Sequence, residues 1–183
     1  SSLVSSSDGL SKHWEVQSRL HPFYDGGRVK ICDRSNSVYC LNNETLSVVN
    51  LSDSTFHTDV LGASKGTDEV VEDGISCFCI HPDGEEIVVA TVSYALKHYR
   101  LDGKSLIRII KGGGYYQMPI LCIEYDRSGT LVATGCADRV VRVWDMVKGH
   151  CTHTFRQHLD IVTHIDFMST DKSISLFSCS SDN

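Results

Sequence analysis

Three segments of the chain share one arrangement of hydrophobic and polar positions. They begin at Ile75, Ile120 and Val162, and each has a second apolar residue three positions on and a third two positions further. A polar turn and a second apolar run follow in each case. Short apolar runs between turn residues are typical of β-strands, and we find no helical periodicity of useful length. The pattern therefore predicts an all-β chain.

The spacing of these segments predicts the architecture. The pattern recurs at intervals of about 42–45 residues, and repeats of this length made of short strands and turns are typical of β-propeller blades. The turns Pro82-Asp83-Gly84 and Asp126-Arg127-Ser128-Gly129 lie at matching places. They support the interpretation, because proline fixes φ and glycine accepts a positive φ. A weaker repeat of three short strands precedes them at residues 28–53.

The repeats predict about three and a half blades of an incomplete ring. We expect them near residues 18–61, 75–110, 119–156 and 158–183. We expect the third strands of the first three near residues 45–51, 94–101 and 139–145. Residues 1–17 are rich in serine and are predicted to be disordered. Because the last repeat stops where a third strand should begin, we interpret the chain as a fragment or as the ordered part of a larger protein.

The strand that ends in Trp144-Asp145 resembles the third strand of a WD repeat. In WD repeats a turn aspartate, a Ser or Thr on the second strand, the tryptophan and a histidine from the preceding loop form a buried hydrogen-bonded set. A buried indole N–H needs an acceptor, and a carboxylate is buried only when it is bonded. The resemblance therefore implies that Thr134, Asp138 and Trp144 are buried and mutually bonded. In the next repeat it places His158, Ser178 and Asp182 in the same structural roles.

Three positions depart from the WD pattern. Tyr116 stands where the histidine of the third repeat would fall, and Gln157 replaces the glycine before His158. In the second repeat, Leu101-Asp102 stands where we expect Trp-Asp. We assign a structural role to the residues that match the WD pattern. We predict no catalytic residues, because the sequence has neither a glycine-rich phosphate loop nor a nucleophile elbow. The run from Lys111 to Gly114 is interpreted as a connector between repeats.

Composition and charge argue against several function classes. The chain is 41% hydrophobic and 22% charged, with a net charge of −6, so it lacks the positive field of a protein that grips nucleic acid by itself. Few basic residues flank the pair Tyr115-Tyr116, which favours loop packing over base stacking. No apolar run approaches the ~18 residues that span a bilayer, and the start of the chain does not resemble a secretory signal. We therefore predict no membrane and no small-molecule substrate as partners.

The eight cysteines allow two interpretations. Most lie in apolar, strand-like stretches, where a free thiol behaves as a small hydrophobic side chain. We favour buried, reduced thiols, while a disulfide framework or a metal site remains open. Cys151 and His153 beside His150 could bind a metal, but they fall in a predicted edge strand. We predict neither a metal nor a cofactor. The cysteines are Cys32, Cys40, Cys77, Cys79, Cys122, Cys136, Cys151 and Cys179.

Two further stretches resemble a particular family of WD-repeat proteins. RLHPFYDGG at residues 19–27 precedes two degenerate repeats, and SGTLVATGCADRVVRVWDMVKGHCTHTFRQH follows at residues 128–158. Their order is similar to that in the transducin-beta-like, U3 small nucleolar RNA-associated proteins of the small-subunit processome. The sequence departs from them at Gln157 and in the insertion-like residues 61–74.

This resemblance implies a nucleolar scaffold that acts in pre-18S ribosomal RNA processing and ribosome biogenesis. Its implied partners are other WD-repeat propeller proteins, with pre-ribosomal RNA and the U3 ribonucleoprotein contacted mainly indirectly. It implies no catalytic residue. An adaptor propeller of a signalling or ubiquitin-ligase complex would share the WD features and remains the alternative, and a propeller hydrolase is a weaker third one.

We expect an exposed apolar surface and an unpaired strand edge near the end of the chain. If the fourth blade has only two strands, apolar residues normally covered by its later strands should be exposed. We expect them among Val132, Val141, Ile165 and Leu176. The second strand of that blade would also have an unpaired edge, which can pair with another chain. We therefore predict that residues 1–183 self-associate or are ordered only within a larger assembly.

Overall fold

The computed structural model describes residues 26–42, 44–52, 55–61, 73–102, 104–111 and 117–182. Within these ranges the chain forms only β-strands and turns, which confirms the all-β prediction. The predictions for residues 1–17, for Tyr115 and Tyr116, and for most of the connector and the insertion-like segment lie outside the described residues.

The strands form three four-stranded antiparallel sheets and one two-stranded sheet, each in sequence order. The first sheet consists of β1 (Val29–Cys32), β2 (Ser37–Asn42), β3 (Thr45–Asn50) and β4 (Phe56–Leu61). The second consists of β5 (Ile75–Ile80), β6 (Glu86–Thr91), β7 (Ala95–Arg100) and β8 (Ser105–Lys111). The third consists of β9 (Ile120–Tyr125), β10 (Leu131–Cys136), β11 (Val141–Asp145) and β12 (His150–Phe155). The last is the hairpin of β13 (Val162–Ser169) and β14 (Ile174–Ser180).

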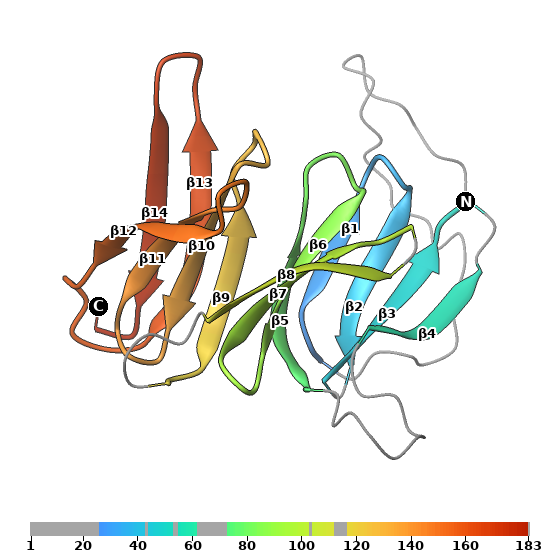
Figure 1. Ribbon diagram of the computed structural model, residues 1–183, viewed down its shortest axis with the longest axis horizontal. Helices are drawn as coiled ribbons and strands as arrows, with labels where there is room; N and C mark the ends of the chain where they lie inside the picture. The colour runs from blue at the N-terminus through green and yellow to red at the C-terminus, as the bar shows by residue number, and fades with distance from the viewer. Residues whose placement is uncertain are drawn as a thin grey trace, which may run out of the picture.

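The sheets follow one another as the blades of an incomplete β-propeller (Figure 1). The first strands of neighbouring blades lie against each other, β5 against β9 and β9 against β13. Side chains of one inner strand also bond to the backbone of the next. The Ser76 hydroxyl donates to the Ile120 carbonyl at 3.1 Å, and the Cys122 thiol donates to the Val162 carbonyl at 3.6 Å. The second blade, the third blade and the last hairpin are thus joined through their inner strands.

The first blade also contacts the third, across the second. The Arg28 guanidinium donates to the Leu121 carbonyl, and the Lys30 ammonium pairs with the Glu124 carboxylate. Arg28 and Lys30 lie at β1, whereas Leu121 and Glu124 lie on β9. These long side chains therefore connect blades that are not neighbours in sequence.

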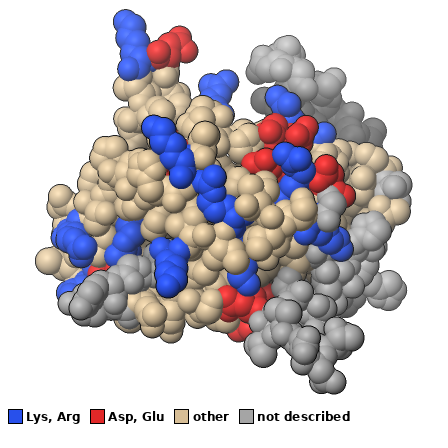
Figure 2. All heavy atoms as spheres, in the orientation of Figure 1, with Lys and Arg blue, Asp and Glu red and all other residues tan. Residues whose placement is uncertain are grey.

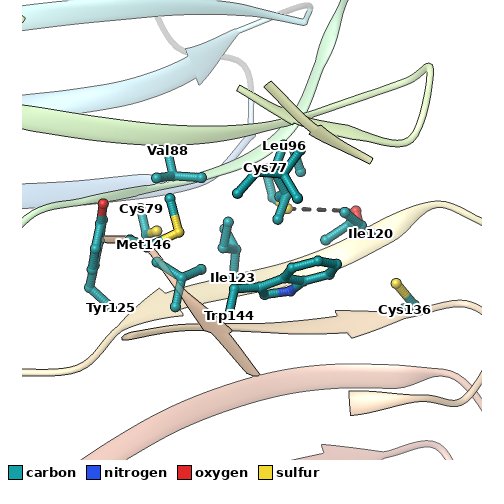
Figure 3. Close-up of a cluster of buried hydrophobic side chains, with 13 residues drawn as sticks. Cys77, Cys79, Val88, Leu96, Ile120, Ile123, Tyr125, Cys136, Trp144 and Met146 are labelled. Carbon is teal, nitrogen blue, oxygen red and sulfur yellow. Dashed lines mark hydrogen bonds between the residues drawn. The ribbon is translucent and has the colours of Figure 1, made fainter. Parts of the chain in front are cut away.

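Three apolar clusters fill the spaces between blades. The cluster between the second and third blades contains side chains from β5, β6, β7, β9, β10 and β11, including Leu96, Ile120 and Trp144 (Figure 3). A second cluster joins the first two blades, and a third joins the third blade to the last hairpin. The central strands are buried on both faces, because each blade packs against a neighbour on either side. The core is therefore divided into layers rather than gathered at one centre.

The turns have the conformation that the sequence predicts. Gly84 and Gly129, which follow the first strands of the second and third blades, have φ angles of 78° and 74°. In the second of these turns, the Gly129 N–H donates to the Asp126 carbonyl at 3.0 Å. Residues with a Cβ rarely adopt this backbone conformation, so glycine is favoured at both positions.

The register of the second blade corrects the expected place of its Trp-Asp pair. In the third blade Val132 pairs with Trp144, and in the second blade the matching Ile87 pairs with Tyr99. Tyr99 therefore takes the place of the tryptophan, and Leu101 lies in the turn beyond the strand. The sequence suggested Leu101 for the tryptophan position because its side chain is apolar. Strand pairing places that position two residues earlier, at Tyr99.

The expected exposure of apolar residues near the last hairpin is wrong for three of the four positions. Val132 is buried in the cluster between the second and third blades, and Val141 and Ile165 are buried in the cluster between the third blade and β13. Leu176 is half-buried at the edge of the same cluster. The two strands of the last hairpin therefore cover the inner part of this face, whereas Phe155 on β12 remains 40% exposed.

The cysteines are all free thiols, and six of them are buried. Burial raises the pKa of Cys77 to about 12 and that of Cys122 to about 11. We expect Cys179, which is exposed, and Cys151, which is half-buried, to react with N-ethylmaleimide in the native protein at pH 8. The buried thiols should react only after unfolding, because the reagent cannot reach them, and the raised pKa of Cys77 and Cys122 keeps these two protonated as well. Mass spectrometry of pulse-labelled protein tests this, and native labelling of Cys77 or Cys122 would contradict it.

Candidate functional site

A buried indole–hydroxyl pair joins β10 and β11 in the third blade. The Trp144 Nε1–H donates to the Thr134 hydroxyl at 2.9 Å, and both residues are buried. Strand pairing brings them together, since Trp144 is opposite Val132 and Thr134 is opposite Arg142. The bond satisfies the only polar atom of the indole, so its ring can pack fully against the second blade.

Asp138 has a different partner from the one expected. Its carboxylate accepts hydrogen bonds from the Arg142 guanidinium, at 2.6 Å to Oδ2 and 3.3 Å to Oδ1. Both side chains are 7% exposed, so this is a buried ion pair. The sequence has Tyr116 where a WD repeat has its histidine, and Arg142 supplies the positive charge next to Asp138 instead. Thr134 and Trp144 are therefore bonded to each other, while Asp138 braces its turn through Arg142.

The other three expected positions come together around the imidazole of His158. Its Nε2 lies 2.8 Å from the Ser178 hydroxyl, and its Nδ1 lies 3.4 Å from the Asp182 carboxylate. Asp182 also accepts a bond from the Leu159 N–H at 2.5 Å. The set therefore holds the loop between β12 and β13 against the end of β14.

The order Asp182–His158–Ser178 is that of a hydrolytic triad, but its setting is different. Ser178 lies inside β14 and pairs with Ile165 of β13. A nucleophilic serine usually projects from a sharp turn, where a substrate carbonyl can approach it. The hydroxyl of Ser178 is half-buried in a strand and bonded to the imidazole. The arrangement is suited to bracing two loops rather than to acyl transfer.

Two cavities lie beside these residues. One, of about 500 Å³, is lined by Met118, Ala137, Asp138, Arg139 and Arg156. The other, of about 290 Å³, lies between the third blade and the last hairpin. Its lining consists of Val141, Phe155, Gln157, His158, Leu176 and Ser178. Neither cavity combines a nucleophile, a base and an oxyanion donor in catalytic geometry.

Asp126 is a structural residue to which sequence analysis assigned only a turn. It is fully buried, and its Oδ1 accepts the Leu131 N–H at 2.8 Å. Its Oδ2 accepts the Ser128 hydroxyl at 2.6 Å. The turn sequence Asp-x-Ser-Gly could have indicated this role, because an aspartate that begins a turn commonly bonds to backbone N–H groups further on.

A second buried polar group, not predicted from sequence, lies between the second and third blades. His98 on β7 is buried, and its Nε2 lies 2.7 Å from the Glu86 carboxylate and 3.5 Å from the Tyr125 hydroxyl. Its Nδ1 has no hydrogen-bond partner among the described atoms. Burial lowers the pKa of His98, and Arg108 acts in the same direction, whereas Glu86 opposes them.

The lowered pKa of His98 predicts a loss of stability in acid. The unfolded chain binds a proton at His98 more readily than the folded chain. The contribution of neutral His98 to stability is therefore complete when the pH is above 6.5, the ordinary pKa of histidine. It is lost as the pH falls below 6.5 and through the lower pKa that His98 has in the folded protein. We expect the melting temperature to fall less between pH 7.5 and pH 5 in His98→Gln than in wild type. Equal slopes in the two proteins would show that His98 does not contribute.

The blades define the class of fold, which is part of a β-propeller, and the Trp144–Thr134 pair lies in a segment that matches a WD repeat. The family described as "WD domain, G-beta repeat" matches residues 104–145 and 149–183. These ranges cover the outer strand of the second blade, the third blade and the last hairpin. The match thus coincides with the part of the chain where the tryptophan, threonine and histidine of the repeats lie.

The chain is also similar to individual proteins. Transducin beta-like protein 3 of Bos taurus is 26% identical over 173 residues, which are 94% of this chain and 20% of that protein. The Homo sapiens protein of the same name is 26% identical over 155 residues, 85% of this chain and 18% of that protein. Periodic tryptophan protein 2 of Arabidopsis thaliana is 36% identical over 73 residues, 40% of this chain and 8% of that protein. The chain thus spans about a fifth of the length of its transducin beta-like relatives.

The described ranges contain no cluster of three or more His, Cys, Asp or Glu side chains arranged to hold a metal ion. Among the same residues, no helix has the length and apolarity needed to cross a membrane.

Proposed function

We propose that this chain is part of a scaffold subunit of the nucleolar small-subunit processome, which acts in pre-18S ribosomal RNA processing and ribosome biogenesis. The observation that carries the proposal is the similarity to transducin beta-like protein 3, which extends over 94% of the chain rather than over the WD motifs alone. The shorter match to periodic tryptophan protein 2 supports the same proposal. A WD-repeat fold provides rigid loops and strand edges for partners, which suits a scaffold.

The proposed partners are other WD-repeat propeller proteins of the processome. The net charge of −6 supports contact with pre-ribosomal RNA and the U3 ribonucleoprotein mainly through such proteins, because a strong RNA-binding surface is usually basic. Under this proposal the protein is located in the nucleolus and has no small-molecule substrate. The buried polar sets around Trp144, Asp138 and His158 then serve to hold the loops in fixed positions for binding.

Affinity purification of the full-length protein tests this proposal. We expect propeller proteins, pre-ribosomal RNA and U3 RNA to co-purify, and the propeller proteins to remain after ribonuclease treatment. Depletion of the protein should lower 18S ribosomal RNA relative to the large-subunit RNA. Co-purification of ubiquitin-ligase or signalling components, without pre-ribosomal RNA, would instead support the adaptor alternative.

A further inference from the structure

The outer strand of the second blade exposes aliphatic side chains along a sheet edge. Within the described ranges, β8 is the last strand of its sheet and pairs with β7 alone. Three of its aliphatic side chains are exposed, Leu106 by 48%, Ile107 by 43% and Ile109 by 57%. An edge strand with exposed apolar side chains and unpaired backbone groups is a template for another strand. β8 is therefore a candidate interaction surface.

The outer strand of the third blade gives a direct comparison. β12 has the sequence His-Cys-Thr-His-Thr-Phe and exposes mainly hydroxyl and imidazole groups, with one apolar ring, that of Phe155, 40% exposed at its end. Both strands hold the same place at the edge of a four-stranded sheet. The apolar character of β8 is thus not a requirement of an outer strand in this fold. It sets β8 apart from its counterpart.

The exposed strand is bounded by positive charge. Lys104 and Lys111 lie at its two ends and are exposed, and neither forms an ion pair with another described residue. Arg108 is held to the third blade, because its guanidinium donates to the Met146 and Val147 carbonyls at 3.1 Å each. Lysine and arginine side chains extend across the middle of the face on which β8 lies, while acidic side chains gather to the upper right of the middle and near the lower border (Figures 1 and 2). The free charges at the strand ends are therefore those of the two lysines.

We propose that β8 binds an extended, acidic segment of a partner protein by strand addition. The segment would pair its backbone with the free edge of β8 and lay alternate aliphatic side chains against Leu106, Ile107 and Ile109. Acidic residues about six or seven positions apart would meet Lys104 and Lys111, because the register shift at Ile107 shortens β8 slightly relative to a regular strand.

Two other occupants fit the strand less well. A second copy of β8 would bring lysine towards lysine, because no acidic residue occurs between Lys104 and Lys111 to compensate. Single-stranded RNA is held by aromatic stacking together with basic residues, and the exposed side chains of β8 are aliphatic. Charge complementarity and side-chain type together favour an acidic β-strand.

Strand addition can be tested with a defined probe on the full-length protein. The probe is a fluorescein-labelled peptide of eight residues, with glutamate at both ends and alternating valine and threonine between them. We expect saturable binding by fluorescence anisotropy, and about tenfold weaker binding to the double variant Lys104→Glu/Lys111→Glu. A peptide with lysine at both ends should show the reverse preference. The matched control is His150→Glu/Thr154→Glu on β12, which should bind the probe as wild type does.

Each other outcome counts against the proposal. Lack of saturable binding to wild type, or equal binding to the Lys104→Glu/Lys111→Glu variant, would overturn it. Undiminished binding of a peptide with N-methylated alternate residues would exclude strand pairing, and competition by oligouridine would indicate an RNA surface instead. Ile109→Thr, which preserves strand propensity, checks the apolar contact and should weaken binding without changing the melting temperature. The surface does not depend on the processome assignment, so peptide binding and the co-purification test can fail separately.

Discussion

Replacing Asp138 by alanine should lower the free energy of unfolding by about 3–5 kcal/mol, because it leaves the buried guanidinium of Arg142 without its carboxylate. The pair is 7% exposed on both sides, so solvent can replace little of the lost interaction. Urea unfolding of the intact protein, monitored by circular dichroism, measures the change. The effect should be local to the third blade, whose turn between β10 and β11 the pair braces.

Two control variants separate the ion pair from other effects. Asp138→Ala/Arg142→Met removes both charges and should recover much of the stability, since apolar replacements of buried pairs are often neutral. Asp171→Ala lies in an exposed turn of the last hairpin and should change stability by less than about 0.5 kcal/mol. If Asp138→Ala unfolds like wild type, the pair has no structural role. Asp138 would then be a candidate for binding at the cavity that it lines.

Trp144→Ala should have an effect of similar size, about 3–5 kcal/mol, because it opens a cavity in the cluster between the second and third blades. Trp144→Phe retains most of the packing and loses the bond to Thr134. It should cost about 1–3 kcal/mol, the range for leaving a buried polar group without a partner.

A double-mutant cycle isolates this bond. Thr134→Val leaves the indole N–H unpaired, whereas Trp144→Phe/Thr134→Val removes both partners. We expect the double variant to be more stable than the sum of the single effects predicts. Additive effects would mean that the 2.9 Å bond contributes no coupling energy and that Trp144 acts by packing alone.

Local sequence signals were sufficient for the strands and turns. The repeated apolar triplets placed the inner strands at Ile75, Ile120 and Val162, and the third strands were expected near their observed positions at β3, β7 and β11. Strand alternation and turn residues act over a few positions, so they can be read directly from the chain. The mutual spacing of Thr134 and Trp144 also follows from strand pairing, and their hydrogen bond forms.

Contacts between side chains that meet only through tertiary packing could not be predicted from the sequence. Arg142 is four residues from Asp138, but nothing in the pattern shows that its guanidinium would turn inward and be buried there. The exposure of Val141 was misjudged because the strand that covers it, β13, lies about 20 residues further along the chain and packs against it only in the folded state. His98 is buried beside Tyr125 of the next blade, and only the packing of the two blades reveals that contact. The pairing of side chains across blades is a tertiary property.

The contacts from Arg28 and Lys30 to β9 have a consequence for the order in which the protein folds during synthesis. The hairpins of the first blade can form soon after they leave the ribosome, since their strands are adjacent in sequence. The ties from β1 to Leu121 and Glu124 can close only after about another 90 residues have been translated. The first blade therefore acquires the bonds of Arg28 and Lys30 only after the third blade has been synthesised. A pause in translation before residue 120 would leave both side chains exposed to solvent.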